Sequence, residues 1–212
     1  MRKLPVYLLL DVSGSMSGEP IEAVRNGMQT LLSALRQDPH ALESAYLSVI
    51  TFGSGVTQIV PLTELGLFQM PTISASGMTP MGQALQLLVD CIGREVATTT
   101  ATVKGDWKPI VFLMSDGGAS DSLTDGLAAI KAAKIGTFIA CAAGPGADLQ
   151  QLKSITESVV HLDTADSQTI KAFFQWVSAS IATTSQKVDL TKKDVAGLSD
   201  LPPPPPEVNV VL

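Results

Sequence analysis

The sequence predicts an α/β fold, with a doubly wound, mostly parallel sheet, helices on both faces and one antiparallel edge strand. Two observations lead to this Rossmann-like fold class. Short aliphatic runs alternate along the chain with longer segments whose apolar residues recur every three or four positions, which is the pattern of strands alternating with helices. The runs over residues 6–10 and 110–114 consist of hydrophobic residues alone, which indicates parallel strands buried on both faces.

The first predicted helix, over residues 19–36, shows the helical pattern most clearly. Its apolar side chains form one stripe, and Pro20 suits the first helical turn. Asp38-Pro39 ends the helix, because the residue before a proline is biased away from helical geometry. An amphipathic helix of this kind predicts a layer that packs on the sheet.

The remaining elements continue the alternation. The turn at residues 53–55 returns the chain as the antiparallel edge strand, Thr79-Pro80 opens a second long helix, and residues 97–108 are polar and irregular. The predicted strands cover residues 4–10, 45–52, 56–60, 109–115, 135–143 and 158–162. The predicted helices are 19–36, the helix that opens at Thr79-Pro80, 122–134, 148–154 and 167–182.

The composition suits one domain and limits the kinds of partner. A chain of 212 residues is long enough for one domain of ordinary size. Hydrophobic residues make up 45% and charged residues 16%, so the chain can bury a large core. The net charge of −6 argues against nucleic acid and anionic membranes as main partners, because both select basic surfaces.

The cysteines and the N-terminal residues give an expectation for the cellular compartment. Cys91 falls in a helical pattern and Cys141 in a strand pattern, and we expect both to be small buried residues rather than a disulfide. Residues 1–5 lead straight into the first strand without a signal-peptide pattern, and no apolar stretch is long enough to span a membrane. We therefore expect a soluble, cytoplasmic protein.

The composition changes after Ile181. We expect the domain to cover residues 1–182 and a C-terminal tail to cover residues 183–212. Residues 202–206 are five consecutive prolines, which form a stiff polyproline II segment. Two interpretations stay open. The polar and proline-rich composition favours a flexible tail, whereas the prolines and the β-prone end could dock into an aromatic groove or add to a sheet edge.

Polar loops follow both buried runs, and a third polar loop lies at the mouth of a helix. Taken alone, Asp-x-Ser-x-Ser after the first run would be a turn. The fold, however, places all three loops at the carboxyl edge of the sheet, where ligands bind. Their carboxylates and hydroxyls are hard ligands that suit Mg²⁺, Mn²⁺ or Ca²⁺. The predicted metal ligands are Asp11, Ser13, Ser15, Thr79 and Asp116.

These five positions match the metal-ion-dependent adhesion site of von Willebrand factor A domains, and residues 4–182 resemble that family. The site is built from Asp-x-Ser-x-Ser, a distant Thr and a distant Asp before Gly. The resemblance implies direct ligation by Ser13 and Ser15, with Thr79, Asp11 and Asp116 bound directly or through water. It also implies that a Glu or Asp from a partner protein takes the open coordination position.

A closer resemblance lies within the family. The opening residues, Leu4 to Met16 followed by Gly18 to Val24, look like those of bacterial tellurium-resistance (TerY-like) proteins. This resemblance implies a bacterial stress-response setting. It also implies partners encoded nearby, which could include a kinase and a phosphatase.

Two functions compete on the sequence alone. The first is a metal-dependent protein–protein interaction module without catalytic activity, and the second is a metal-dependent phosphoesterase or hydrolase. A phosphatase with an aspartyl nucleophile would carry an acidic residue in place of Ser13. The chain has no phosphate-binding P-loop, no nucleophile elbow and only two histidines. The residues therefore favour the interaction module.

Several polar residues near these loops have simpler expected roles. Asp121 and Asp125 are expected to cap and charge the start of the helix that follows them, and Glu19 to serve the start of its own helix. His161, close to Asp163, is expected at a strand end near the same sheet edge.

Overall fold

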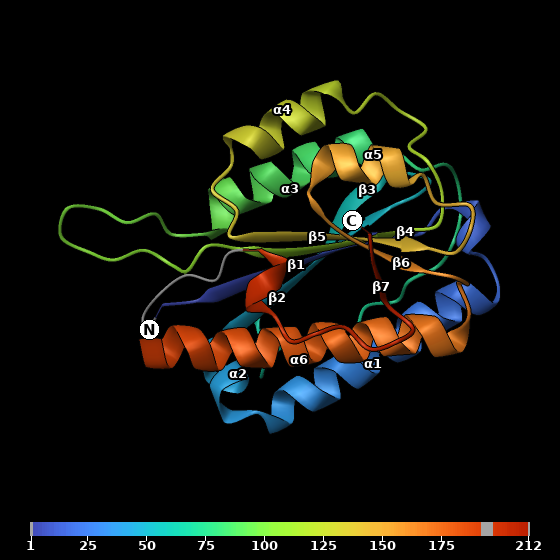
Figure 1. Cartoon of the computed structure of the whole chain (residues 1–212). Coiled ribbons are helices and arrows are strands. Elements are labelled where there is room, and N and C mark those ends of the chain that lie inside the picture. Colours follow the sequence, from blue (N-terminus) through green and yellow to red (C-terminus); the bar gives the residue numbers. More distant parts are fainter. Residues whose placement is uncertain (1, 192–196, 212) are drawn as a thin grey trace.

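The computed structural model describes residues 2–191 and 197–211, and these form a sheet with helices on both sides (Figure 1). The strands are β1 (Leu4–Asp11), β2 (Ala45–Phe52), β3 (Val56–Glu64), β4 (Ile110–Ser115), β5 (Thr137–Ala143), β6 (Ser158–Leu162) and β7 (Asn209–Val211). The helices are α1 (Glu19–Gln37), α2 (Pro39–Ser44), α3 (Met81–Glu95), α4 (Thr124–Ala132), α5 (Leu149–Ile155) and α6 (Ser167–Thr191), with 3-10 turns at Gly14–Met16 and Leu198–Asp200.

The sheet has the strand order β3-β2-β1-β4-β5-β6-β7. Strands β2, β1, β4, β5 and β6 run parallel, and β3 and β7 close the two edges in antiparallel pairings. The predicted doubly wound α/β fold is therefore confirmed. The chain adds a second antiparallel edge strand, β7, to the one that the sequence predicts.

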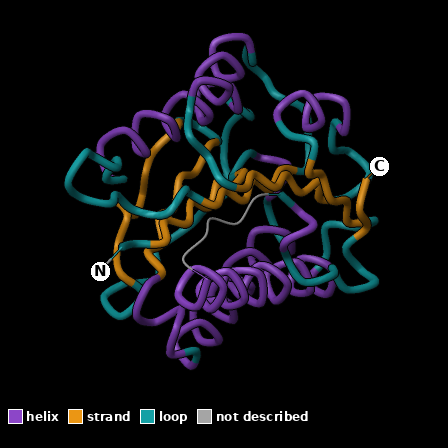
Figure 2. Tube along the Cα trace, turned by 60° about the vertical axis from the view of Figure 1, so that its left-hand side comes forward, coloured by secondary structure: helices purple, strands orange, loops and turns teal. Residues whose placement is uncertain are grey.

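Two hydrophobic cores fill the space between the three layers, which Figure 2 shows nearly edge-on. Helices α1, α2 and α6 cover one face of the sheet, and α3, α4 and α5 cover the other. Every residue of β1 is buried, because alternate side chains point into the two cores. Leu8 and Leu10 pack toward α1 and α6, whereas Tyr7 and Leu9 pack toward α3.

A short helix, α2, follows α1, where the sequence predicts only the end of a helix. Asp38 serves both helices, since its backbone N–H donates to the Leu35 carbonyl at the end of α1 and its carboxylate accepts from the Ala41 N–H at 2.8 Å. Pro39 then occupies the first position of α2, where a proline is favourable. The Asp-Pro pair thus ends one helix and starts another.

The C-terminal part of the chain differs from the expected flexible tail. Helix α6 continues past residue 182 to Thr191, and Trp176 Nε1 donates to the Pro202 carbonyl at 2.8 Å. Val208 is buried, and β7 pairs with β6. Residues 192–196 lie outside the described residues. The β-prone end therefore adds to a sheet edge, as one interpretation proposed, but the edge belongs to its own chain.

The cysteines lie where the sequence places them. Cys91 is buried in α3 and Cys141 is buried in β5, and both are free thiols. In the described part of the chain, no helix has both the length and the hydrophobicity that a membrane crossing requires.

The crossing of α1 and α6 depends on the absence of a side chain at Gly27. A Cβ at this position would lie 2.3 Å from Phe174 Cδ2. We expect Gly27→Ala to lower the free energy of unfolding by about 1–3 kcal/mol through overpacking. Gly93→Ala in α3 is the matched control, because a Cβ there meets no heavy atom within 4 Å. It should raise the free energy of unfolding by about 0.5–1 kcal/mol. Urea denaturation measures the free energy of unfolding of both variants. Equal changes in the two would contradict the close approach of α1 and α6 at Gly27.

Candidate metal centre

Two adjacent strands deliver the acidic residues of the candidate metal centre to one edge of the sheet. Asp11 is the last residue of β1, and Asp116 follows Ser115, the last residue of β4. The parallel register pairs Leu10 with Met114, so the two strands end side by side. Side chains at the carboxyl ends of adjacent parallel strands face the crevice where ligands bind in open α/β sheets.

The carboxylate of Asp11 is buried and held on both oxygens. Its side chain is 1% exposed, Oδ1 accepts from the Ser13 N–H at 2.8 Å, and Oδ2 accepts from the Ser115 hydroxyl at 2.5 Å. Burial raises the pKa of the Asp11 carboxyl above its usual range, the hydrogen bonds from Ser115 and Ser13 oppose the rise, and the charge of Asp116 adds to it. A buried anion of this kind is stabilised by a cation.

A row of hydroxyls connects the buried part of the centre to its exposed part. Ser13 Oγ and Ser15 Oγ lie 2.9 Å apart, and the Ser15 hydroxyl donates to Asp116 Oδ1 at 2.8 Å. Ser13 is 2% exposed, whereas Ser15 is exposed and Asp116 is half-buried. The possible metal ligands here are two carboxylates and several hydroxyl oxygens, and these ligands fit a hard divalent cation such as Mg²⁺, Mn²⁺ or Ca²⁺.

The loop that carries Thr79 is joined to the first loop through backbone hydrogen bonds. The Ser76 N–H donates to the Val12 carbonyl at 2.7 Å, and the Gly14 N–H donates to the Gly77 carbonyl at 2.9 Å. Gly77 has a φ of +83°, which only glycine adopts without strain, so its carbonyl can turn toward Gly14. This joins the Thr79 loop to the loop that carries the serines.

Thr79 itself is 9% exposed, and its backbone groups pair with the loop after β4. Its N–H donates to the Ser120 hydroxyl at 3.1 Å, and its carbonyl accepts from the Ser120 N–H at 2.8 Å. Four of the five predicted ligands are thus linked in a row: the Ser13 backbone N–H bonds to the Asp11 carboxylate, and side-chain hydrogen bonds join Ser13, Ser15 and Asp116. Thr79 reaches the same edge through the backbone of its loop.

Two serines of the centre were not predicted from the sequence. Ser115 orients the Asp11 carboxylate, and Ser120 fixes the backbone of Thr79. Ser115 precedes a predicted ligand, but its role depends on β4 lying next to β1. That adjacency is a property of the strand order, and the local sequence does not contain it.

The expected roles of the neighbouring acids are partly wrong. Asp121 was expected to cap the helix that follows it, α4, but its carboxylate accepts from the N–H groups of Gly82 and Gln83 at the start of α3, each at 2.9 Å. Asp125 lies in the first turn of α4, as expected. Glu19 lies in the first turn of α1, and its carboxylate accepts from the Ser167 N–H at the start of α6.

The centre is not a cluster of acidic or imidazole side chains. Across the residues that the structure describes, no group of three or more His, Cys, Asp or Glu side chains is arranged to hold a metal ion. His161 lies on β6, with its Nδ1 3.6 Å from Asp163 Oδ1. The serine and threonine hydroxyls would therefore supply much of any coordination at the centre.

A family model for the von Willebrand factor type A domain matches residues 6–176. The chain therefore belongs to the von Willebrand factor type A domain family. Domains of this family typically act as metal-dependent adhesion or protein-interaction modules. No curated protein sequence matches this chain.

Several solved structures share the fold at low sequence identity. A von Willebrand factor type A protein from Catenulispora acidiphila has a TM-score of 0.65 and 16% identity, over 86% of this chain and 43% of that chain. The D319A mutant of the PilB minor pilin from Streptococcus sanguinis has a TM-score of 0.66 and 11% identity, over 91% of this chain and 64% of that chain. This chain spans less than two thirds of both structures.

A third structure has an occupied metal site. Proximal thread matrix protein 1 from the mussel byssus, with a zinc-occupied metal-ion-dependent adhesion site, has a TM-score of 0.61 and 18% identity, over 84% of this chain and 45% of that chain. At this identity the similarity establishes the fold alone. The occupied site belongs to the byssus protein.

The hydrogen bond from Ser115 to Asp11 leads to a stability prediction. Ser115→Ala leaves Asp11 Oδ2 without its hydroxyl donor, so we expect the free energy of unfolding of the metal-free protein to fall by about 1–3 kcal/mol. Ser180→Ala is the matched control, since both serines are 0% exposed but the Ser180 hydroxyl has no hydrogen-bond partner among the described residues. Its replacement should be neutral or stabilising. Chemical denaturation in the presence of a chelator measures the stability of both variants. Equal losses of stability would contradict the role of the Ser115 hydroxyl as the donor to Asp11.

Proposed function

We propose that this chain is a protein-interaction module that binds an acidic side chain of a partner protein through one divalent cation. The observation that carries the proposal is the hydrogen-bonded row Asp11–Ser13–Ser15–Asp116 at the carboxyl edge of the sheet. Thr79 would complete the ligand set from its adjacent loop. Mg²⁺ is the proposed cation, and Mn²⁺ and Ca²⁺ suit the same oxygen ligands.

The charge of the ligand set supports the choice of partner. Two directly bound carboxylates would neutralise a divalent cation, so the proposal has one of them act through a water molecule. The directly bound ligands are then mostly neutral hydroxyls, and the cation still attracts a carboxylate from outside. The exposed position of Ser15 leaves the outer side of the centre open to solvent. A Glu or Asp on a partner protein is the proposed external ligand.

Hydrogen bonds within the candidate metal centre already orient its carboxylates and hydroxyls in a way that suits cation binding. The Ser13 N–H and the Ser115 hydroxyl hold Asp11, which restricts the rotation of its carboxylate. The Ser15 hydroxyl donates its only hydrogen to Asp116, so the Ser13 hydroxyl donates to Ser15 Oγ. This leaves one lone pair on Ser15 Oγ and both lone pairs on Ser13 Oγ available to a cation. The centre therefore needs little rearrangement of its hydroxyl hydrogens to bind a metal ion.

A metal-dependent hydrolase is the alternative function, and the contacts of the serines favour it less. A serine nucleophile needs a general base within hydrogen-bond reach. The side-chain hydroxyls of Ser13 and Ser15 pair with each other and with Asp116, which a bound cation would share. A two-metal hydrolase would place more carboxylates around the centre than these two. We therefore propose a non-catalytic module, as is usual in the family.

The resemblance of the opening residues, Leu4 to Met16 and Gly18 to Val24, to bacterial tellurium-resistance proteins supports a finer proposal. We infer that the partner belongs to a bacterial stress-response system and that a kinase or a phosphatase of that system is a candidate. The cytoplasm is the proposed compartment. Identification of the captured partner, described below, tests this part separately from metal binding.

The first prediction concerns the cation. Purified protein should bind one Mg²⁺ or Mn²⁺ ion per chain in calorimetry, and Asp116→Ala should abolish binding while circular dichroism shows an intact fold. At a free-ion concentration 100 times the dissociation constant, binding should stabilise the wild type by about 2.7 kcal/mol. Asp125→Ala removes an exposed aspartate from α4 and should leave binding unchanged. Unchanged binding in Asp116→Ala would remove Asp116 from the site.

The second prediction concerns the partner. Affinity capture with wild-type protein and Mg²⁺ should retain proteins that are lost with chelator and reduced with Thr79→Ala, because chelator removes the bridging cation and Thr79→Ala weakens its binding. Thr63→Ala is the control, since Thr63 pairs with Leu47 near the opposite edge of the sheet. A partner that binds equally well with chelator and with Thr79→Ala must use another face of the domain.

A further inference from the structure

The segment that carries Thr79 has little regular secondary structure of its own. This connecting segment, residues 65–80, joins β3 to α3 and contains neither strand nor α-helix. Backbone groups that are not paired within secondary structure need partners elsewhere, and side chains are one source. The position of Thr79 therefore depends on contacts that reach the connecting segment from other elements.

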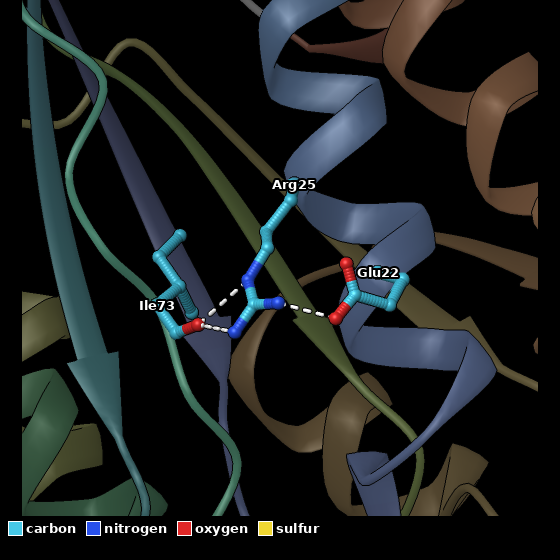
Figure 3. Close-up of polar contacts among 3 residues, drawn as sticks. All are labelled: Glu22, Arg25 and Ile73. Carbon is cyan, nitrogen blue, oxygen red and sulfur yellow. Dashed lines mark hydrogen bonds and ion pairs between the residues drawn. The ribbon is translucent and has the colours of Figure 1, made fainter.

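Arg25 on α1 supplies one of these contacts, close to the candidate metal centre. Figure 3 shows its guanidinium lying between the backbone carbonyl of Ile73 and the carboxylate of Glu22. Nε donates to the Ile73 carbonyl at 2.7 Å, Nη2 donates to the same oxygen, and Nη1 pairs with Glu22 Oε1. One carbonyl thus accepts two charged N–H groups, and Glu22 holds the guanidinium in place.

The chain after Ile73 runs directly into the contacts that position Thr79. Ser76 donates to Val12, Gly77 accepts from Gly14, and Thr79 follows two residues later. A cavity of about 300 Å³ lies along the same stretch and is lined in part by Thr72, Ile73, Ser74 and Ser76. The Ile73 side chain is buried in the hydrophobic core, and the backbone of this stretch borders the hollow. Hydrogen bonds to its backbone groups therefore add to the packing of Ile73 in holding the segment.

We propose that Arg25 is a positioning residue for the metal site. By holding the Ile73 carbonyl, it fixes the part of the connecting segment that places Thr79 against the loop of Asp11, Ser13 and Ser15. Arg25 does not touch the cation, and it acts through Thr79. This inference rests on the proposed metal-binding function and adds to it the means by which α1 keeps the threonine loop in its binding position.

A second arginine on the same helix provides an internal control. Arg36 donates from Nε to the Leu65 carbonyl at 3.2 Å and from Nη2 to the Phe68 carbonyl at 2.5 Å. It therefore holds the same connecting segment to α1 through the same chemistry, but at the end that leaves β3. Loss of Arg36 should cost stability without moving Thr79.

The test compares Arg25→Met with Arg36→Met, because methionine keeps an unbranched apolar stem and removes the guanidinium. Mn²⁺ binding is measured from the electron paramagnetic resonance of free Mn²⁺, and stability is measured by denaturation. We expect both variants to lose stability, but only Arg25→Met to weaken Mn²⁺ binding, by about tenfold, the low end of the effect of outer-shell partners on metal affinity. Loss of a positive charge by itself favours cation binding, so this weakening has the opposite sign to the electrostatic effect.

Two further measurements separate positioning from a general effect on the fold. Arg25→Lys keeps the charge and can offer one donor, so it should restore part of the affinity. In the Thr79→Ala background, Arg25→Met should cause almost no further loss, because its effect passes through Thr79; a mutation at an independent site would instead add its full cost. If Arg25→Met does not fold, Arg25→Gln takes its place, because it also removes the guanidinium and the positive charge and should weaken Mn²⁺ binding in the same direction.

The outcomes that overturn the inference differ from those that overturn the function. If the wild type binds Mn²⁺, three results would each reject Arg25 as a positioning residue and leave the metal site standing. These are an unchanged Mn²⁺ affinity in Arg25→Met, an equal loss of affinity in Arg36→Met, and additive losses of affinity when Arg25→Met is combined with Thr79→Ala. A wild-type protein that binds no Mn²⁺ would reject the proposed function, and this inference with it.

Discussion

The arrangement of the candidate metal centre depends on one constraint, which is that the carboxylate of Asp11 is buried at the end of a central strand. A buried carboxylate without hydrogen-bond donors costs several kcal/mol, so the fold has to place donors around it. The Ser13 N–H meets this need from within the same loop, and the Ser115 hydroxyl can do so because β1 and β4 end side by side. The loop after β1 forms a 3-10 turn at Gly14–Met16, in which the Ser15 hydroxyl lies between Ser13 Oγ and Asp116.

A second physical theme is the way in which irregular segments are held by side chains from distant elements. Asp121 caps α3 from the loop after β4, Glu19 of α1 caps α6, and Gln151 of α5 accepts from the Ala119 N–H at 2.7 Å. Arg25 and Arg36 add two contacts from α1 to the segment between β3 and α3. Each contact satisfies a backbone group at a helix start or in an irregular segment, and each one joins elements that lie far apart in the chain.

Much of the fold follows from local patterns of hydrophobic residues in the sequence. The aliphatic runs of β1 and β4 are buried on both faces because parallel strands are covered by helices on both sides, and the stripe of α1 follows from the helical period. The strands β2 and β6 begin and end where the sequence predicts. The position of Asp11 and Asp116 at strand ends follows from the same patterns, since the carboxyl ends of parallel strands share one edge. The short helix α2 was missed because Asp38-Pro39 can end a helix or begin one.

The sequence by itself determined the fold class, the carboxyl ends of the parallel strands to within one residue, and the residue types at the candidate metal centre, because the hydrophobic period and the run boundaries are local properties. Only the tertiary structure decided which distant groups meet. Whether Asp121 caps α3 or α4 depends on the loop that passes within reach of its carboxylate, and the choice of Ser115 as the partner of Asp11 depends on strand order. The C-terminal end was ambiguous for the same reason. A short β-prone segment pairs only if an open edge lies within its reach, and β6 supplies that edge here.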